Sequence, residues 1–197
     1  MNIIGVTGNS GSGKTTVSKI IEQEINAKVI EADKISKSLT SNETEYLQAI
    51  VEIFGKEILL KSRKLNRKKL AKIIYNDEKS RDKLNAITFK YVVNEIKKEL
   101  NKIKMEKIYN TIVLDVPLLF ESGLDKECNI VIGVLAPKVE KIKRICYRDK
   151  IQKDQAIKRL DTQLDDEYYK QHCNFVIENI NYIKTRMEVV EILKKLQ

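Results

Sequence analysis

Residues 8–15, with the sequence GNSGSGKT, constrain the fold of this chain more than any other segment. They fit the pattern G-x-x-x-x-G-K-[ST], whose chemistry requires a buried strand before it and a helix after it. Both flanks agree, because residues 2–6 are short, apolar and β-branched, and residues 17–25 repeat valine and isoleucine at helical spacing. The sequence therefore predicts an α/β fold that opens with a strand, this loop and a helix.

The loop has the composition of a phosphate-binding site. Its glycines allow the backbone N–H groups to turn toward an anion at the positive end of the following helix. Lys14 can reach the β- and γ-phosphates of a nucleotide, and the Thr15 hydroxyl can ligate Mg²⁺. A glycine-rich turn that binds nothing is disfavoured, because the flanking strand and helix make the motif specific. The nucleotide-binding residues predicted here are Gly11, Ser12, Gly13, Lys14, Thr15 and Thr16.

Length and composition fit one cytosolic domain. The 197 residues can build one well-buried core with insertions, and no apolar stretch approaches the ~18 residues of a membrane span. The chain enters its first strand without a signal peptide, and three scattered cysteines favour a reducing cytosol over a disulfide framework. The single histidine, His172, completes neither a zinc site nor a Ser-His-Asp arrangement, so we expect it to be an ordinary surface or helix-end residue.

The net charge of +9 permits two kinds of partner, nucleic acid or small polyanions. Lysine is spread along the chain instead of clustering with aromatic residues, and runs such as residues 61–64 are typical of solvated helix faces. The charge alone therefore does not choose between these partners.

Apolar segments and helical patterns alternate along the chain, which favours a parallel sheet covered on both faces. Strands are predicted at residues 2–6, 28–32, 111–116, 129–135 and 175–177. The fourth of these is continuously apolar, so we expect it to be the central strand of the sheet. A final helix carries Ile183, Met187, Val190, Leu193 and Leu196.

Two helical stretches are inserted between these strands. The first, about residues 35–108, is too long for a simple crossover and contains an amphipathic face made of Phe89, Val92, Val93, Ile96 and Leu100. The second covers about residues 138–166. With no repeat and no low-complexity linker, we predict a single domain over residues 1–197 with two helical insertions.

Insertions beside a phosphate loop are typical of a kinase, in which one insertion holds the acceptor and the other closes over ATP. A lid rich in arginine can neutralise phosphate charge and exclude water. Arg144 and Arg148 are four residues apart in the second insertion and share a helix face, and Arg159 follows. The alternative for these arginines is ordinary salt bridging on a solvated helix.

Several segments match one kinase family in the right order. The opening residues 5–21 are similar to L-T-G-G-x-G-S-G-K-S-T-V, residues 30–35 (IEADKI) to D-A-D-x-I, and IFG with LNRKKL at 53–55 and 65–70 to F-G…L-[DN]-R-x-x-L. Residues 115–121 (DVPLLFE) contain P-L-L-F-E, and the lid segments RICYR at 144–148 and RLDTQ at 159–163 match R-L-x-x-R and R-[IL]-x-x-Q. Over nearly its whole length the chain resembles the dephospho-coenzyme A kinases.

This resemblance implies transfer of the ATP γ-phosphate to the ribose 3′-hydroxyl of dephospho-coenzyme A, with Mg²⁺, as the last step of coenzyme A synthesis. It also implies a P-loop NTPase fold of the nucleoside-monophosphate-kinase type, with a parallel five-stranded sheet, an acceptor-binding helical insertion and a lid. We expect a cytoplasmic enzyme, a monomer or weak homo-oligomer, whose partners are ATP and dephospho-coenzyme A. Neither nucleic acid nor a membrane is expected as a partner.

The resemblance also implies roles for particular residues. The catalytic ones are Lys14, Asp33 and Arg148; the residues added to the ATP site are Arg144 and Asn179; metal contacts are Thr15 and, through water, Asp115; the acceptor residues are Asp33, Arg67, Pro117, Leu118, Leu119, Phe120 and Glu121. Asp33 follows a predicted strand, where open α/β sheets bind their ligands, so it suits a general base. The alternatives are a helix N-cap for Asp33 and plain core packing for residues 117–121.

The chain departs from the family pattern at several places. Phe89 and Lys90 stand where the family has His-Pro, Ser62-Arg63 where it has Asp-Gly, and Lys141 where the lid has glutamine. Asn181 replaces a glycine, which would suit a left-handed backbone. The first three changes lie in the acceptor insertion and lid, so they affect the expected acceptor affinity more than ATP binding.

Three other functions fit parts of the sequence. A GTPase switch would carry N-K-x-D, and this tetrapeptide is absent from the sequence. A nucleic-acid-binding module fits the charge but leaves the phosphate loop and lid arginines unexplained. The remaining alternative is another small P-loop kinase, acting on a nucleoside or a nucleoside monophosphate.

Overall fold

The computed structural model describes residues 1–41 and 44–196, so Asn42 and Glu43, inside the predicted first insertion, and Gln197, inside the predicted domain, lie outside the described residues. This described part divides into two compact units, Met1–Glu31 with Leu100–Gln197, and Ala32–Glu99. The second unit contains most of the first predicted insertion. No helix among the described residues combines the length and apolar content needed to cross a membrane.

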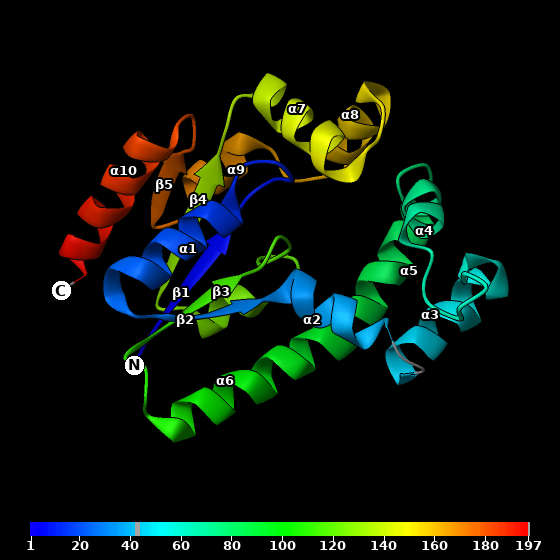
Figure 1. Cartoon of the computed structure of the whole chain (residues 1–197), viewed down its shortest axis with the longest axis horizontal. Helices are drawn as coiled ribbons and strands as arrows, with labels where there is room; N and C mark the ends of the chain where they lie inside the picture. The colour runs from blue at the N-terminus through cyan, green and yellow to red at the C-terminus, as the bar shows by residue number, and fades with distance from the viewer. Residues whose placement is uncertain (42–43, 197) are drawn as a thin grey trace. The chain divides into compact units, whose positions relative to one another are not determined.

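The first unit is built on a parallel sheet, which in the described residues has five strands in the order β2-β3-β1-β4-β5 (Figure 1). The strands are β1 (Asn2–Thr7), β2 (Lys28–Glu31), β3 (Thr111–Asp115), β4 (Ile130–Leu135) and β5 (Phe175–Glu178). The predicted parallel α/β fold is therefore confirmed. The central strand is β1 and not β4 as expected, and β4 lies between β1 and the edge strand β5. Val6 of β1 is in register with Asp115 of β3, so the strand before the loop ends beside a carboxylate.

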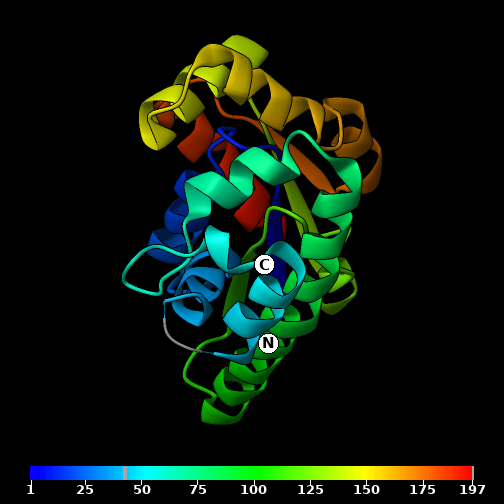
Figure 2. The ribbon, with the colours of Figure 1, turned by 90° about the vertical axis from the view of Figure 1, so that its right-hand side faces the viewer.

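A pair of helices follows β4 in the predicted lid (Figure 2, yellow-green and gold). They are α7 (Lys138–Asp149) and α8 (Lys153–Asp161), and they enclose a small apolar core of Ile145, Ala156 and Leu160. Lys150 ends α7 with a φ of 52°, the left-handed conformation that turns the chain back toward α8. The lid therefore has packing of its own.

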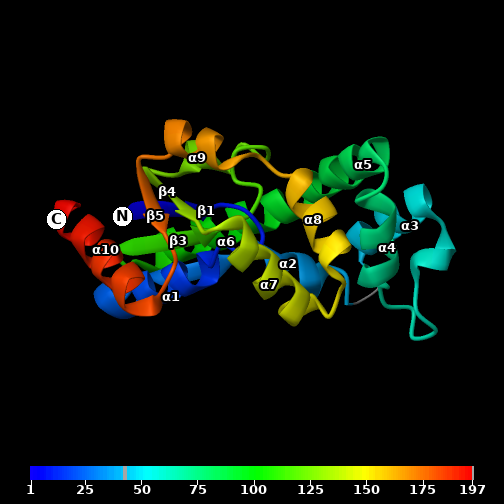
Figure 3. The same ribbon diagram turned by 90° about the horizontal axis from the view of Figure 1, so that it is seen from above.

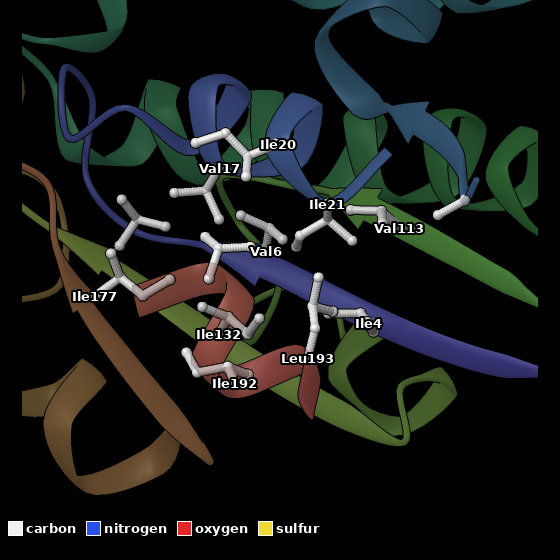
Figure 4. Close-up of a cluster of buried hydrophobic side chains, with 13 residues drawn as sticks. Ile4, Val6, Val17, Ile20, Ile21, Val113, Ile132, Ile177, Ile192 and Leu193 are labelled. Carbon is white, nitrogen blue, oxygen red and sulfur yellow. The ribbon is translucent and has the colours of Figure 1, made fainter. Parts of the chain in front are cut away.

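Helices cover the two faces of the sheet (Figure 3). On one face α1 (Lys14–Ile25) packs beside α10 (Tyr182–Lys195), and α9 (Asp166–His172) lies on the other. Apart from Ala27, the core between α1, α10 and the strands consists of valine, isoleucine and leucine, and Figure 4 labels Val6, Val17, Ile132, Ile177 and Leu193 among them. Of the predicted apolar series in the last helix, Leu193 is buried, but Ile183 and Met187 are 74% and 69% exposed. The apolar face of α10 was therefore predicted only in part.

Glycines on two strands make room for side chains on the α9 face. A Cβ atom at Gly5 would lie 2.8 Å from Leu119 Cδ2 and 2.8 Å from Cys128 Sγ, and one at Gly133 would lie 2.9 Å from Cys173 Sγ. Cys128 directly follows the short helix η3 (Leu124–Glu127). Burial raises the pKa of both thiols to about 12, so they behave as small apolar groups.

The second unit is helical. It contains α2 (Ala32–Leu39), α3 (Glu45–Phe54), η1 (Lys56–Ile58), α4 (Arg67–Ile74), α5 (Glu78–Thr88), the π-helical segment η2 (Phe89–Val93) and the start of α6 (Asn94–Glu106). Val92 and Ile96 of the predicted amphipathic face are buried. Phe89 and Lys90, which replace the family's His-Pro, open the π-helical turn, a conformation that is frequent at functional sites.

One turn in this unit holds an arginine in a strained conformation. Leu60 N–H donates to the Lys64 carbonyl at 2.8 Å, and within that turn Arg63, which replaces the family's glycine, has a φ of 59°. This left-handed conformation costs a non-glycine residue about 1–2 kcal/mol of folding free energy. Glycine avoids this cost, but it also makes the unfolded chain more flexible, which cancels part of the gain in stability.

We therefore expect Arg63→Gly to raise the free energy of unfolding by about 0.5–1 kcal/mol. Urea unfolding followed by circular dichroism measures the change. Lys61→Gly is the matched control, since Lys61 does not have a positive φ and should lose stability on the same substitution. Equal losses for both variants would show that the arginine is not strained.

Candidate active site

The phosphate loop connects β1 to α1. Lys14 begins the helix and is only 9% exposed, and its Nζ donates to the carbonyls of Gly8 at 2.9 Å and Asn9 at 3.1 Å. Gly13 precedes the helix with a φ of 101°, and a Cβ there would lie 1.8 Å from Asn179 Nδ2. Only glycine fits this position, because any other residue would be strained at this φ and its Cβ would overlap Asn179. The lysine ammonium is thus held against the backbone of the loop.

Thr15 and Asp115 face each other across the end of the sheet. The Thr15 hydroxyl donates to Asp115 Oδ2 at 2.9 Å, and Asp115 is 5% exposed at the end of β3. A hydroxyl and one carboxylate are the hard oxygen ligands that Mg²⁺ accepts beside phosphate and water. The chemistry of these two side chains fits a Mg²⁺ ion, and the metal site stays a prediction. In the described part of the chain no three acidic, His or Cys side chains gather into a larger metal cluster.

Asn179 follows β5 and holds the loop from its other side. Its Nδ2 donates to the Ser12 carbonyl at 2.8 Å, and its Oδ1 accepts from the Thr185 hydroxyl at 3.0 Å. These contacts assign the side chain to shaping the loop. Asn181, by contrast, has an extended φ of −135° and caps α10, so the left-handed backbone considered for it does not occur.

Arg144 of α7 joins the lid to the loop. Its Nη1 donates to the carbonyls of Gly11 at 3.1 Å and Ser12 at 3.2 Å, and its Nη2 donates to the Asn179 carbonyl at 3.0 Å. The structure therefore brings this predicted ATP residue directly to the loop. Thr16, also predicted, lies in the first turn of α1.

Two lid contacts were not predicted. Gln163 Oε1 accepts the Ser10 backbone N–H at 2.8 Å, and the buried Lys141 Nζ forms an ion pair with Asp166 at 2.8 Å. Gln163 belongs to a motif that the sequence displayed, but nothing in the spacing indicated its partner. Lys141, which replaces the lid glutamine of the family, is 4% exposed and would be costly to bury without Asp166.

Arg148 and Arg159 both contact Asp149. Asp149 Oδ1 accepts from Arg148 Nε at 2.8 Å, while Oδ2 accepts from Arg148 Nη2 at 2.9 Å and from Arg159 Nη1 at 2.7 Å. Burial alone would raise the pKa of this carboxyl, but the hydrogen bonds and charges of the two arginines together hold it below its usual range. Arg148 and Arg159 thus form salt bridges, whereas Arg144 donates to backbone carbonyls, and Asp149 was missed by sequence reasoning.

The predicted acceptor segment 117–121 follows β3 as a series of turns. Leu119 is fully buried beside Gly5, so it is a core residue and not part of a binding surface, because its side chain fills the space that the glycine leaves. Pro117 and Leu118 are half-buried, and Glu121 is exposed. Phe120 is half-buried and packs edge-on against Tyr168 at a centroid distance of 5.4 Å.

His172, for which the sequence predicted no functional role, is exposed at the end of α9. Its ring stacks on that of Tyr168 at a centroid distance of 4.0 Å.

The remaining predicted residues, Asp33 and Arg67, lie in the second unit. Asp33 is exposed in the first turn of α2, and because this helix already begins at Ala32, Asp33 is inside the helix and not the cap before Lys34. Arg67 begins α4, and its Nη2 donates to the Ser36 carbonyl at 3.2 Å and to the Thr40 hydroxyl. Arg67 is therefore fixed against the same helix that carries Asp33.

A parallel sheet with a phosphate loop after β1, a Thr–Asp pair beside it and an arginine-bearing helical pair after β4 define a P-loop kinase fold. A family model described as dephospho-CoA kinase matches residues 2–185. The dephospho-CoA kinase of Fusobacterium nucleatum is 39% identical over 189 residues, which cover 96% of this chain and 95% of the relative. The chain belongs to the dephospho-CoA kinase family.

Solved structures agree with this assignment. A dephospho-CoA kinase from Campylobacter jejuni has a TM-score of 0.67 at 30% identity, covering 99% of this chain and 96% of that one. A Thermus thermophilus protein has a TM-score of 0.79 at 25% identity, covering 100% of this chain and 98% of that one.

Proposed function

We propose that this chain transfers the γ-phosphate of ATP to the ribose 3′-hydroxyl of dephospho-coenzyme A. The observation that carries the proposal is the family match over residues 2–185, which includes the phosphate loop and the lid. The P–O bond to ADP breaks, a P–O bond to the 3′-oxygen forms, and the hydroxyl proton passes to a carboxylate, for which Asp33 is proposed.

Each remaining group has a proposed task. The loop N–H groups hold the phosphates, and Lys14 neutralises charge on the transferred group. Thr15 and Asp115 would hold Mg²⁺, which when bound neutralises phosphate charge. Arg144 and Asn179 shape the nucleotide side of the loop, while Arg67 and the exposed part of residues 117–121 contact the acceptor. We also propose a cytoplasmic location and a monomer or weak homo-oligomer, with neither nucleic acid nor a membrane as partner.

The decisive experiment is incubation of the purified chain with ATP, Mg²⁺ and dephospho-coenzyme A, followed by identification of the product by mass spectrometry. Loss of the new phosphate to a 3′-nucleotidase identifies the 3′-position. AMP and adenosine serve as competing acceptors, because both lack the pantetheine arm. Preferential phosphorylation of either one would establish the alternative, a nucleoside or nucleoside-monophosphate kinase.

Arg148→Ala is expected to lower turnover roughly 10- to 100-fold while changing ATP affinity much less, because a lid arginine contacts the phosphates only when the lid closes. The Arg148 side chain is 54% exposed, so water weakens its interactions, and we expect a smaller loss of turnover than for a fully buried donor. Steady-state kinetics and calorimetric ATP binding give the two numbers. Arg186→Ala, which breaks a surface ion pair with Glu24, is the control.

Equal losses of binding and turnover in Arg148→Ala would indicate a contact already made in the ground state. Unchanged kinetics would leave Arg148 as a surface salt bridge only.

A further inference from the structure

One carboxylate in the lid holds two arginines from different helices. Arg148 and Asp149 end α7, and Arg159 comes from α8. Asp149 meets Arg148 through both of its oxygens, and its Oδ2 also accepts from Arg159, with all three N–O distances between 2.7 and 2.9 Å. Asp149 and Arg159 have side chains only 27% and 26% exposed, so this is not a loose surface contact.

The shared oxygen brings two guanidinium groups close together. Two such cations repel each other, and the carboxylate between them offsets that repulsion. The bidentate contact also fixes the plane of the Arg148 guanidinium, since parallel N–H donors match a carboxylate only in one orientation. The cluster keeps a formal charge of +1, so it still attracts a polyphosphate.

We propose that Asp149 is a positioning residue for phosphoryl transfer, which holds Arg148 and Arg159 as one preorganised cationic pair for the phosphates of ATP. This inference rests on the proposed function. Its effect is entropic, because side chains held in place before the reaction lose less freedom when they meet the transition state. The competing possibility is that Asp149 occupies the arginines and must be displaced by ATP.

The lid supplies a matched control. Lys138 of α7 and Asp161 of α8 form an ion pair of 3.1 Å between the same two helices, with no arginine involved. Asp149→Asn and Asp161→Asn therefore change the net charge of the lid equally, and each weakens one α7–α8 ion pair. Only Asp149→Asn removes a partner of Arg148 and Arg159.

We expect Asp149→Asn to lower kcat about 10-fold with the KM for ATP changed less than about threefold, and Asp161→Asn to leave both nearly unchanged. In an Arg148→Ala background, Asp149→Asn should lower kcat much less than it does in the wild type, because substitutions at residues that act as a unit do not have additive effects. Asp149→Glu keeps the negative charge but moves it away from the arginines, so we expect a smaller loss of kcat than for Asp149→Asn. This variant also tests the proposal if Asp149→Asn does not fold.

Three results would overturn the proposal. They are equal kinetics for Asp149→Asn and Asp161→Asn, tighter ATP binding in Asp149→Asn, and fully multiplicative effects in the double variant. If the wild-type chain does not phosphorylate dephospho-coenzyme A, the proposed function fails, and binding of ADP with fluoroaluminate, a mimic of the transferred group, tests the inference without an acceptor. Asp149→Asn should then weaken fluoroaluminate-dependent binding about 10-fold and leave ADP binding unchanged; no difference would refute the inference.

Discussion

Lys14→Ala is expected to lower turnover by about 10²–10³-fold, the size measured when one preorganised donor to a developing negative charge is removed. The lysine is almost fully buried, and the Gly8 and Asn9 carbonyls fix its ammonium within 3.1 Å. Little reorganisation is therefore needed when charge moves onto the transferred phosphoryl group. Steady-state turnover with ATP and dephospho-coenzyme A measures the loss.

The control for this variant is Lys19→Ala, which removes an exposed lysine from the same helix. Lys19→Ala should keep full activity, and both variants should keep the circular dichroism spectrum of the wild type. Near wild-type turnover in Lys14→Ala would mean that the loop binds nucleotide without taking part in transfer.

Asp33→Asn is expected to lower turnover by ~10²–10⁴-fold, the range of general-base catalysis. Asparagine has nearly the same shape and still accepts a hydrogen bond, but it cannot take the proton of the 3′-hydroxyl. Dephospho-coenzyme A affinity should therefore change little, and ATP affinity less. Measuring turnover and acceptor binding on the same variant separates the base from a merely orienting group.

Asp77→Asn is the control in the same unit. Asp77 caps α5 by accepting the Ser80 N–H at 2.9 Å, and asparagine caps a helix as well as aspartate does. This variant should keep its activity. If Asp33→Asn were equally active, the assignment of Asp33 as the base would be wrong.

The fold could be predicted because its signals are local. The strand, loop and helix around residues 8–15 and the continuously apolar β4 each show their structure within a short window of sequence. The last helix was harder to predict, since Ile183 and Met187 are apolar but exposed, while Thr185 is polar and buried. Apolar side chains remain common on protein surfaces, so periodicity alone misplaced that face.

The contacts that shape the candidate site are not local. Asn179 bonds to Ser12 from 167 residues away, and Gln163 bonds to Ser10 from 153 residues away, so no spacing rule relates them. Asp149 was missed for another reason. Neighbours in a helix do not ordinarily face each other, yet Asp149 stands at the end of α7, where the turn toward α8 lets it meet both arginines.

The fit of Leu119 beside Gly5 has a consequence for how the sequence can change among relatives. A methyl group at position 5 would lie 2.8 Å from both Leu119 and Cys128, so this position cannot take a larger residue unless those two side chains shift or become smaller. Gly5 lies three residues before the phosphate loop, and Leu119 immediately precedes Phe120. In related chains we therefore expect these three positions to covary, with their summed volume conserved more strictly than their identities.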